Sequence, residues 1–137
     1  MKRRIAVLSL FVLIAVGLYA ADARERLASQ AAEQWLALID VGKYPESWQD
    51  TSTYMQKAVA KKRWQEILTS TRKPLGTLEK RKLKNARYQT TLPGAPDGQY
   101  VVCVFDTSFQ NKKEAVETVT MQLEMDGDWK PSGYFIR

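Results

Sequence analysis

The last third of the chain, residues 92–137, alternates apolar and polar side chains in the manner of sheet strands. The alternation is most regular in residues 117–125, where after Glu117 every second side chain is apolar and the intervening ones are Thr, Gln or Glu. Side chains of a strand point to opposite faces in turn, so this segment predicts a half-buried antiparallel strand. Asp126-Gly127 is typical of a two-residue hairpin, which would pair residues 128–137 with it. The side chains expected to face inward are Val119, Met121, Leu123 and Met125.

Two further strands are predicted before this hairpin. Residues 100–109 are apolar on both faces for much of their length, which is typical of an inner strand. Residues 77–92 form an extended segment with so many charges on both faces that part of it has to border water or a polar cavity. Simple alternation there places Lys80, Lys82 and Lys84 on one face and Arg81, Leu83 and Arg87 on the other. Pro131 indicates that the last strand is an edge strand or contains a bulge.

The residues before the sheet have helical spacing. Residues 24–41 predict a long helix with one apolar face, ended by Gly42 and Pro45. Its apolar face is expected to include Leu27, Ala31, Trp35 and Leu38, with Ala28, Ala32 and Ile39 beside them. A single helical turn at 45–48 and two short helices at 52–59 and 61–71 follow. We therefore expect an α+β fold: N-terminal helices, one long and two short, packed on a curved four-stranded antiparallel meander, cone-like and with a pocket at its open end.

The first residues have the composition of an export signal. Lys2, Arg3 and Arg4 precede an uncharged apolar run over 5–18, and Ala21-Asp22-Ala23 resembles a cleavage site. The run is shorter than the ~20 apolar residues that span a bilayer, which favours a cleaved signal over a membrane anchor. We expect residues 1–23 to be a signal peptide and residues 24–137 a single domain, periplasmic or secreted. Cleavage would lower the formal charge of +6, because three cations leave with one anion.

The chain contains no histidine and a single cysteine, Cys103. The absence of histidine excludes Ser-His-Asp and Cys-His catalysis and ordinary zinc sites. A lone cysteine forms no internal disulfide, and its place in an apolar run predicts a buried, unreactive thiol. The sequence also lacks the spacing of a phosphate loop, a dinucleotide fingerprint or a calcium loop. We therefore expect no intrinsic cofactor and no metal.

A series of short motifs extends over nearly all of the predicted domain. The motifs are Trp35-Leu36, Ile39-Asp40-x-Gly42-x-Tyr44, Ser47-Trp48, Trp64, Arg72-x-Pro74-Leu75-Gly76, Arg81, Leu92-Pro93-Gly94-Ala95-Pro96-Asp97-Gly98-x-Tyr100, Glu117-Thr118-Val119, Asp126-Gly127-x-Trp129 and Gly133-Tyr134. In type and spacing they resemble a family of small bacterial exported proteins known only as domain of unknown function number four thousand and nineteen. The resemblance implies a cystatin-like, nuclear-transport-factor-2-like superfold and no particular reaction. Pro131-Ser132 depart from the apolar strand residues expected there, so a regular last strand is not implied.

The first candidate site is a set of aromatic and arginine side chains expected at the open end of the fold. Arginine suits two-pronged capture of carboxylate or phosphate, and aromatic rings offer flat contact surfaces. The candidate ligand-binding residues are Tyr44, Trp48, Tyr54, Arg72, Arg81, Tyr100 and Tyr134. The competing interpretation is structural: Trp48 fills the interior, and Arg72 caps helix carbonyls or pairs with Asp40.

Two other sets of residues are alternative candidates for a functional site. Asp40, Glu46, Asp50 and Asp106 are candidates for acid–base chemistry with Tyr or Lys, which requires a carboxylate inside the fold with a raised pKa. The basic segment 80–87 suits weak attraction to anionic lipid or acidic glycan, or serves as a solvated edge that blocks aggregation. Nucleic acid is not expected to meet an exported protein.

These observations favour an exported small binding or interaction protein without enzymatic activity. Its partner would be a small molecule or an envelope protein. The alternatives are a small cone-fold enzyme that uses carboxylate and tyrosine acid–base chemistry, and an envelope assembly or scaffold module. The sequence leaves the ligand and the oligomeric state open.

Overall fold

The computed structural model describes residues 23–137, so the predicted signal peptide lies outside the described residues except for Ala23. Residues 23–40 form the N-terminal helix. It is followed by α2 (Tyr44–Gln49), α3 (Thr53–Ala58), α4 (Lys61–Thr71) and the short 3₁₀ helix η1 (Lys73–Leu75). The single turn predicted at 45–48 is therefore a longer helix, with Pro45 in its first turn, where its missing N–H is tolerated. Within residues 23–137, no helix is long and apolar enough to cross a membrane.

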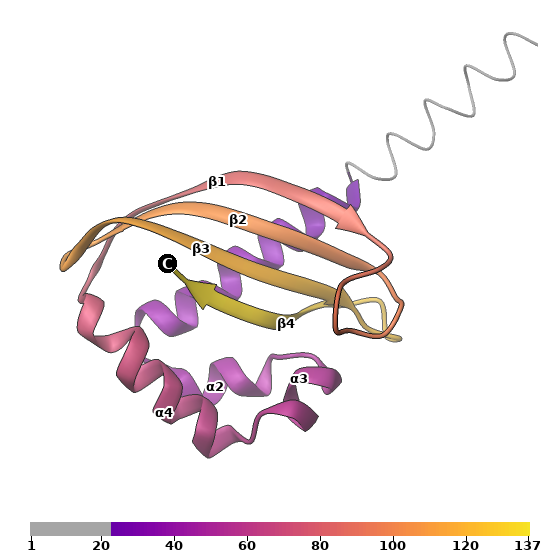
Figure 1. The fold of residues 1–137 in the computed structure, drawn as a ribbon, viewed down its shortest axis with the longest axis horizontal. Helices are drawn as coiled ribbons and strands as arrows, with labels where there is room; N and C mark the ends of the chain where they lie inside the picture. Colours follow the sequence, from indigo (N-terminus) through magenta and orange to yellow (C-terminus); the bar gives the residue numbers. More distant parts are fainter. Residues whose placement is uncertain (1–22) are drawn as a thin grey trace, which may run out of the picture.

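The sheet follows the helices in sequence, which confirms the α+β fold class. Its strands are β1 (Leu78–Gln89), β2 (Tyr100–Phe109), β3 (Lys112–Leu123) and β4 (Trp129–Ile136), each antiparallel to the next in the order β1-β2-β3-β4. Figure 1 shows the N-terminal helix crossing behind the curved sheet, with α2, α3 and α4 below β4. The N-terminal helix thus covers one face of the sheet, and the shorter helices extend beyond its β4 edge.

The core lies between the N-terminal helix and the inner face of β2 and β3. The buried helix residues are Ala28, Ala32, Trp35, Leu36 and Ile39, and they pack against Val101, Cys103, Phe105, Val119 and Met121. The buried stripe is rotated relative to the predicted one, because Leu36 is inside while Leu27 is 49% exposed. Cys103 is buried, as its apolar neighbours predicted.

The β3–β4 hairpin differs from the two-residue turn expected at Asp126-Gly127. Glu124 accepts a hydrogen bond from the Gly127 N–H at 3.0 Å and donates its own N–H to the Asp128 carbonyl at 2.9 Å. The loop therefore has three residues, and Gly127 takes the positive φ of 88° that such a loop needs. β3 ends at Leu123, so Met125 lies in the loop and is fully exposed instead of facing inward.

Register shifts interrupt the alternation of both outer strands. In β1 the shift between Leu83 and Asn85 inserts one residue, so Arg87 pairs with Val102 while Arg81 pairs with Thr107. Arg87 therefore lies on the outer face and does not share the inner face with Arg81, contrary to simple alternation. In β4 a shift occurs beside Pro131, and β4 is an edge strand. Both features that Pro131 predicted are present.

Ser47 of α2 connects two tryptophans in the helical layer. Trp35 donates its indole N–H to the Ser47 carbonyl at 2.8 Å, and Trp64 donates to the Ser47 hydroxyl at 2.9 Å. The hydroxyl in turn donates to the Tyr44 carbonyl at 2.7 Å. The rings of Trp35 and Trp64 stack with centroids 6.0 Å apart. Both buried indole N–H groups are thus satisfied by one residue, which holds α2 and α4 against the N-terminal helix.

Replacing Ser47 with alanine should destabilise the protein by about 1–3 kcal/mol, because the Trp64 N–H then has no acceptor in a buried site. Urea unfolding followed by tryptophan fluorescence measures this loss. Thr69→Ala is the matched control, since Thr69 is an exposed α4 residue whose hydroxyl bonds only the Gln65 carbonyl of its own helix. Equal unfolding midpoints for the two variants would contradict the assignment.

Burial, with smaller contributions from the charges of Glu33 and Glu25, raises the pKa of the Cys103 thiol from 9.0 to about 12. As pH rises, the unfolded chain therefore loses the thiol proton before the folded chain does. The stability that the protonated thiol contributes is full below pH 9.0 and is lost as pH rises toward 12. Cys103→Ala should accordingly lose less stability between about pH 8 and about pH 11 than the unmodified protein. Urea titrations across this range compare the two slopes, and identical slopes would show that the thiol does not titrate in this way.

Candidate functional site

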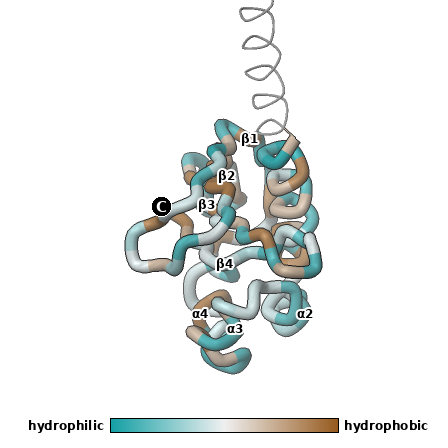
Figure 2. The backbone as a smooth tube through the Cα atoms, turned by 90° about the vertical axis from the view of Figure 1, so that its right-hand side faces the viewer, coloured by the Kyte–Doolittle hydropathy of each residue, from teal (hydrophilic) through white to brown (hydrophobic). Residues whose placement is uncertain are grey.

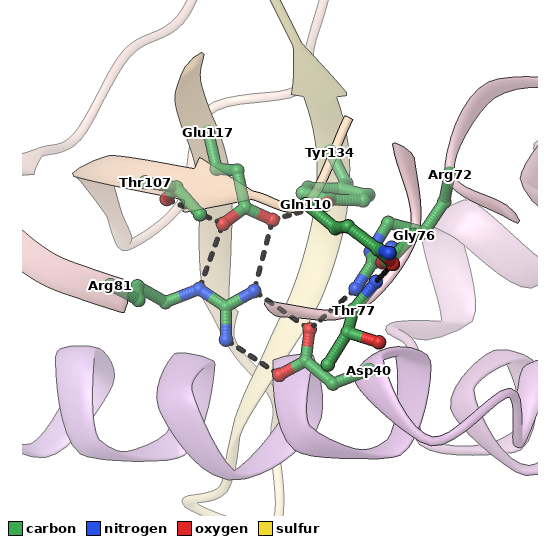
Figure 3. Close-up of polar contacts among 9 residues, drawn as sticks. All are labelled: Asp40, Arg72, Gly76, Thr77, Arg81, Thr107, Gln110, Glu117 and Tyr134. Carbon is green, nitrogen blue, oxygen red and sulfur yellow. Dashed lines mark hydrogen bonds and ion pairs between the residues drawn. The ribbon is translucent and has the colours of Figure 1, made fainter. Parts of the chain in front are cut away.

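Six polar side chains converge beside the C-terminal end of the N-terminal helix (Figure 3). Each comes from a different element: the helix itself, the C-cap of α4, and each of the four strands. We call this set the polar cluster. Its members are Asp40, Arg72, Arg81, Thr107, Glu117 and Tyr134.

Arg81 of β1 lies at the centre of the polar cluster, between two carboxylates. It binds Asp40 through two N–H groups, Nη1 to Oδ2 at 2.7 Å and Nη2 to Oδ1 at 2.9 Å. Its Nε donates to Glu117 Oε1 at 2.7 Å, and Nη2 also reaches Oε2 at 3.3 Å. One planar guanidinium thus joins the helix to β3, a geometry that a lysine does not reproduce.

Glu117 of β3 is completely buried. Besides Arg81, its carboxylate accepts a hydrogen bond from the Thr107 hydroxyl at 2.7 Å and another from the Tyr134 hydroxyl. An ionised carboxylate offers about four lone-pair sites, and these four contacts occupy them. Glu117 is therefore a fully engaged acceptor.

Arg72 supplies the second cation of the polar cluster and is only 3% exposed. Its Nη2 lies 3.3 Å from Asp40 Oδ1, and its Nη1 donates to the Gly76 carbonyl at 2.7 Å. The guanidinium lies 4.3 Å from the centroid of the Phe109 ring, which adds a cation–π contact. Two buried cations and two carboxylates balance, so the polar cluster is formally neutral.

The surroundings fix the protonation of Arg81 and Tyr134. Burial opposes the charge on Arg81, but the hydrogen bonds and charges of Asp40 and Glu117 outweigh it and raise its pKa. Burial, together with the negative charge and hydrogen bond of Glu117, raises the pKa of Tyr134. Arg81 thus stays charged and Tyr134 stays a hydrogen-bond donor at any physiological pH.

The structural interpretation of Arg72 fits this geometry, because Arg72 does pair with Asp40. For acid–base catalysis, Glu117 would first have to release one of the four hydrogen bonds that hold it. Of the carboxylates proposed for that chemistry, only Asp40 belongs to the polar cluster. Glu46, Asp50 and Asp106 are exposed on α2, beyond its end and on the outer face of β2.

The seven predicted ligand-binding residues do not share one pocket. Arg72, Arg81 and Tyr134 meet in the polar cluster. Tyr54 and Tyr100 lie instead at the loop between β1 and β2, where their hydroxyls donate to the carbonyls of Gly94 at 3.3 Å and Pro96 at 2.6 Å. The two remaining residues, Tyr44 and Trp48, are partly buried against the core, with the Trp48 indole bonded to the Val59 carbonyl.

Glu117 and Thr107 were missed as site residues, although a signal for one of them was present. The row of inward side chains at Val119 and Met121 continues backwards, at the same spacing, to Glu117. A charged residue at an inward strand position is rarely buried without a partner. That position therefore pointed to a buried ion pair.

An apolar groove of about 410 Å³ lies between α4 and β4. We call it the α4–β4 groove; Figure 2 shows α4, with a hydrophobic stretch, below β4. Phe135 is 54% exposed beside it, and Lys112 and Arg137 add positive charge to its lining. Its other lining residues are Trp64, Ile67, Leu68, Thr71, Leu75, Tyr134 and Ile136. Tyr134 therefore belongs to both the groove and the polar cluster.

Two other hollows are more polar in their lining side chains. One, of about 520 Å³, lies on the outer face of the sheet and includes Lys80, Lys82 and Asp106. The other, of about 560 Å³, lies between the N-terminal helix and the β3–β4 hairpin and includes Asp50, Asp128 and Lys130. Ligand sites usually combine an apolar lining with a few polar groups, so the α4–β4 groove is the better candidate.

Glu117→Gln should destabilise the protein by about 3–5 kcal/mol, because Arg81 keeps its buried charge with only one carboxylate left to offset it. Chemical denaturation measures the loss. Glu114→Gln changes an exposed carboxylate of the same strand and should leave the unfolding midpoint in place. A Glu117→Gln protein as stable as this control would show that the ion pair is not coupled to folding.

Comparison with known proteins adds one finding. A family model described as "Protein of unknown function (DUF4019)" matches residues 31–134. The matched range contains all six members of the polar cluster and all of α4. No curated protein and no solved structure matches the chain.

Proposed function

Because the chain belongs to the DUF4019 family, whose function is unknown, we propose a function from its own geometry: an exported, non-catalytic binding protein that holds its partner in the α4–β4 groove. Export through residues 1–23 and a cystatin-like, nuclear-transport-factor-2-like superfold are parts of this proposal. They are supported by the composition of the N-terminal segment and by the order of helices and strands.

The observation that carries the proposal is the exposed apolar lining of the α4–β4 groove. Phe135 is 54% exposed, and Ile67 on the opposite wall is only partly buried. Grouped apolar side chains that face water on a small monomeric domain mark interaction surfaces more often than single ones do. A partner that covers them would gain the hydrophobic free energy that folding leaves unused.

The polar cluster holds α4 and β4, the two walls of the α4–β4 groove, in fixed positions. Arg72 at the end of α4 is bonded to Asp40, and Tyr134 of β4 is bonded to Glu117. Arg81 joins the two carboxylates. The walls are therefore set before a partner arrives, which reduces the entropy lost on binding.

A binding role also suits the chemistry of the interior better than catalysis does. A general base needs a free lone pair within hydrogen-bond reach of a substrate. The carboxylate of Glu117 is completely buried and already accepts four hydrogen bonds. The charged side chains of the polar cluster therefore hold the fold together, and we expect the partner to bind in the α4–β4 groove beside them.

The proposal predicts that 1,8-anilinonaphthalene sulfonate, an apolar anionic dye, binds in the α4–β4 groove. Ile67→Asp should weaken dye binding by about tenfold or more, because it adds a carboxylate to the apolar wall. Dye fluorescence gives the affinity, and amide shifts in ¹H–¹⁵N NMR spectra give the place of binding. Thr69→Asp is the control, since Thr69 is exposed on α4 outside the groove.

The proposal fails if the dye shifts amides of another hollow and leaves those of α4 and β4 unchanged. It also fails if both variants bind the dye as the unmodified protein does. Circular dichroism of each variant verifies that the fold is retained.

A further inference from the structure

The two edges of the sheet differ in how they are protected. The β1 edge carries several lysines and a bulge, and the N-terminal helix covers part of it through a hydrogen bond from the Tyr88 N–H to Glu25 at 3.1 Å. Charge, bulges and covering elements are the usual means of blocking further strand pairing. The last residues of β4, Tyr134, Phe135 and Ile136, are uncharged and border the α4–β4 groove.

The hydrogen-bond pattern shows which backbone groups β4 turns to its open side. Arg137 and Val116 exchange two hydrogen bonds, at 3.0 and 2.8 Å, so they form a hydrogen-bonded pair of the antiparallel ladder. Such pairs alternate with pairs whose N–H and C=O groups point away from each other. Ile136 opposite Glu117 and Tyr134 opposite Val119 are of the second kind. Their N–H and C=O groups therefore point outward from β4.

The first half of β4 shows the same outward direction with a partner in place. The Pro131 carbonyl accepts a hydrogen bond from the Ser52 N–H at 2.8 Å, just before α3 begins. The segment that enters α3 thus covers this part of the edge. Further along β4, Tyr134, Phe135 and Ile136 border the α4–β4 groove instead.

We propose that the α4–β4 groove receives an extended protein segment that adds a fifth strand beside β4. This inference rests on the proposed binding function and names the class of partner. The backbone of the segment would bond the outward groups of Tyr134 and Ile136. Alternate side chains would enter the groove toward Ile67 and Leu75 of the opposite wall. In this mode main-chain hydrogen bonds supply affinity, and the pockets for alternate side chains supply specificity.

The charge of the site identifies the occupant as an acidic-flanked segment of another protein. Lys112 and Arg137 are part of the groove lining and give it positive charge. A second copy would bring its own Lys112 and Arg137 to the same place, where like charges repel. A segment with apolar residues at alternate positions and glutamate or aspartate at its ends complements both the apolar walls and the positive charge of the groove.

The test uses a capped heptapeptide, Glu-Val-Thr-Val-Thr-Val-Glu, labelled with a fluorophore, and two versions that carry backbone N-methyl groups on alternate residues. Successive N–H groups of a strand point to opposite edges, so each version removes the donors of one edge only. The unmethylated peptide should bind and shift the amide signals of Tyr134 and Ile136. One methylated version should lose about tenfold or more in affinity, and the other should bind as before.

A protein variant tests the same contact from the other side. Ile136→Pro removes an outward N–H, and proline is tolerated in an edge strand where its nitrogen faces away from the sheet. It should weaken peptide binding by about tenfold or more, whereas the control Ile136→Val should not. Circular dichroism of both variants verifies that the sheet is retained.

The inference is overturned if the heptapeptide does not bind, or if both methylated versions bind equally well. It is also overturned if light scattering shows a dimer that Ile136→Pro dissociates, because the occupant would then be a second copy. In each of these cases dye binding in the groove leaves the proposed function standing. Loss of dye binding at the groove in the unmodified protein is the separate result that removes the proposed function.

Discussion

The guanidinium of Arg81 lies between the carboxylates of Asp40 and Glu117, and the arrangement of the layers depends on it. A buried cation is costly unless charges and hydrogen bonds surround it, and two bidentate carboxylates provide both. Buried ion pairs often add little net stability compared with apolar residues of similar size. Here the ion pairs fix the orientation of the N-terminal helix on the sheet. The planar guanidinium can bond both carboxylates only when the end of the helix and β3 lie in one relative position. We infer that this contact selects one packing of helix on sheet among several that the apolar core alone would allow.

Elements with strong local patterns could be predicted from the sequence. β2 and α4 have the bounds expected for residues 100–109 and 61–71, because apolar periodicity and nearby turn residues define them locally. The structure departs from the prediction where contacts with distant parts of the chain determine the local conformation. The bulge at Lys84 depends on the register against β2, and it moves Arg87 to the outer face. Met125 continues an apolar alternation beyond the end of β3, where no face remains to bury it.

The candidate site could be predicted only in part for the same reason. The binding chemistry of arginine and tyrosine predicts that such side chains gather at a site, and Arg72, Arg81 and Tyr134 do meet. Their meeting depends on Glu117, whose charge is compatible with an inward position only because four donors arrive from other elements. A local sequence pattern does not show that donors from several distant elements meet at one carboxylate. Tyr54 and Tyr100 share the same chemistry, but the loop between β1 and β2 supplies them with carbonyl partners far along the sheet from the polar cluster.

Because the polar cluster takes one residue from every strand, it is complete only when residues far apart in the sequence have come together. Asp40 and Arg81 are separated by 41 positions and Arg81 and Glu117 by 36, and Tyr134 lies close to the C-terminus. Long-range pairings of this kind close large loops before they gain contacts, so they form late in folding. Until β4 pairs with β3, the carboxylate of Glu117 therefore lacks the hydrogen bond from Tyr134. The native packing of the helix on the sheet is therefore complete only after the last strand has joined the sheet.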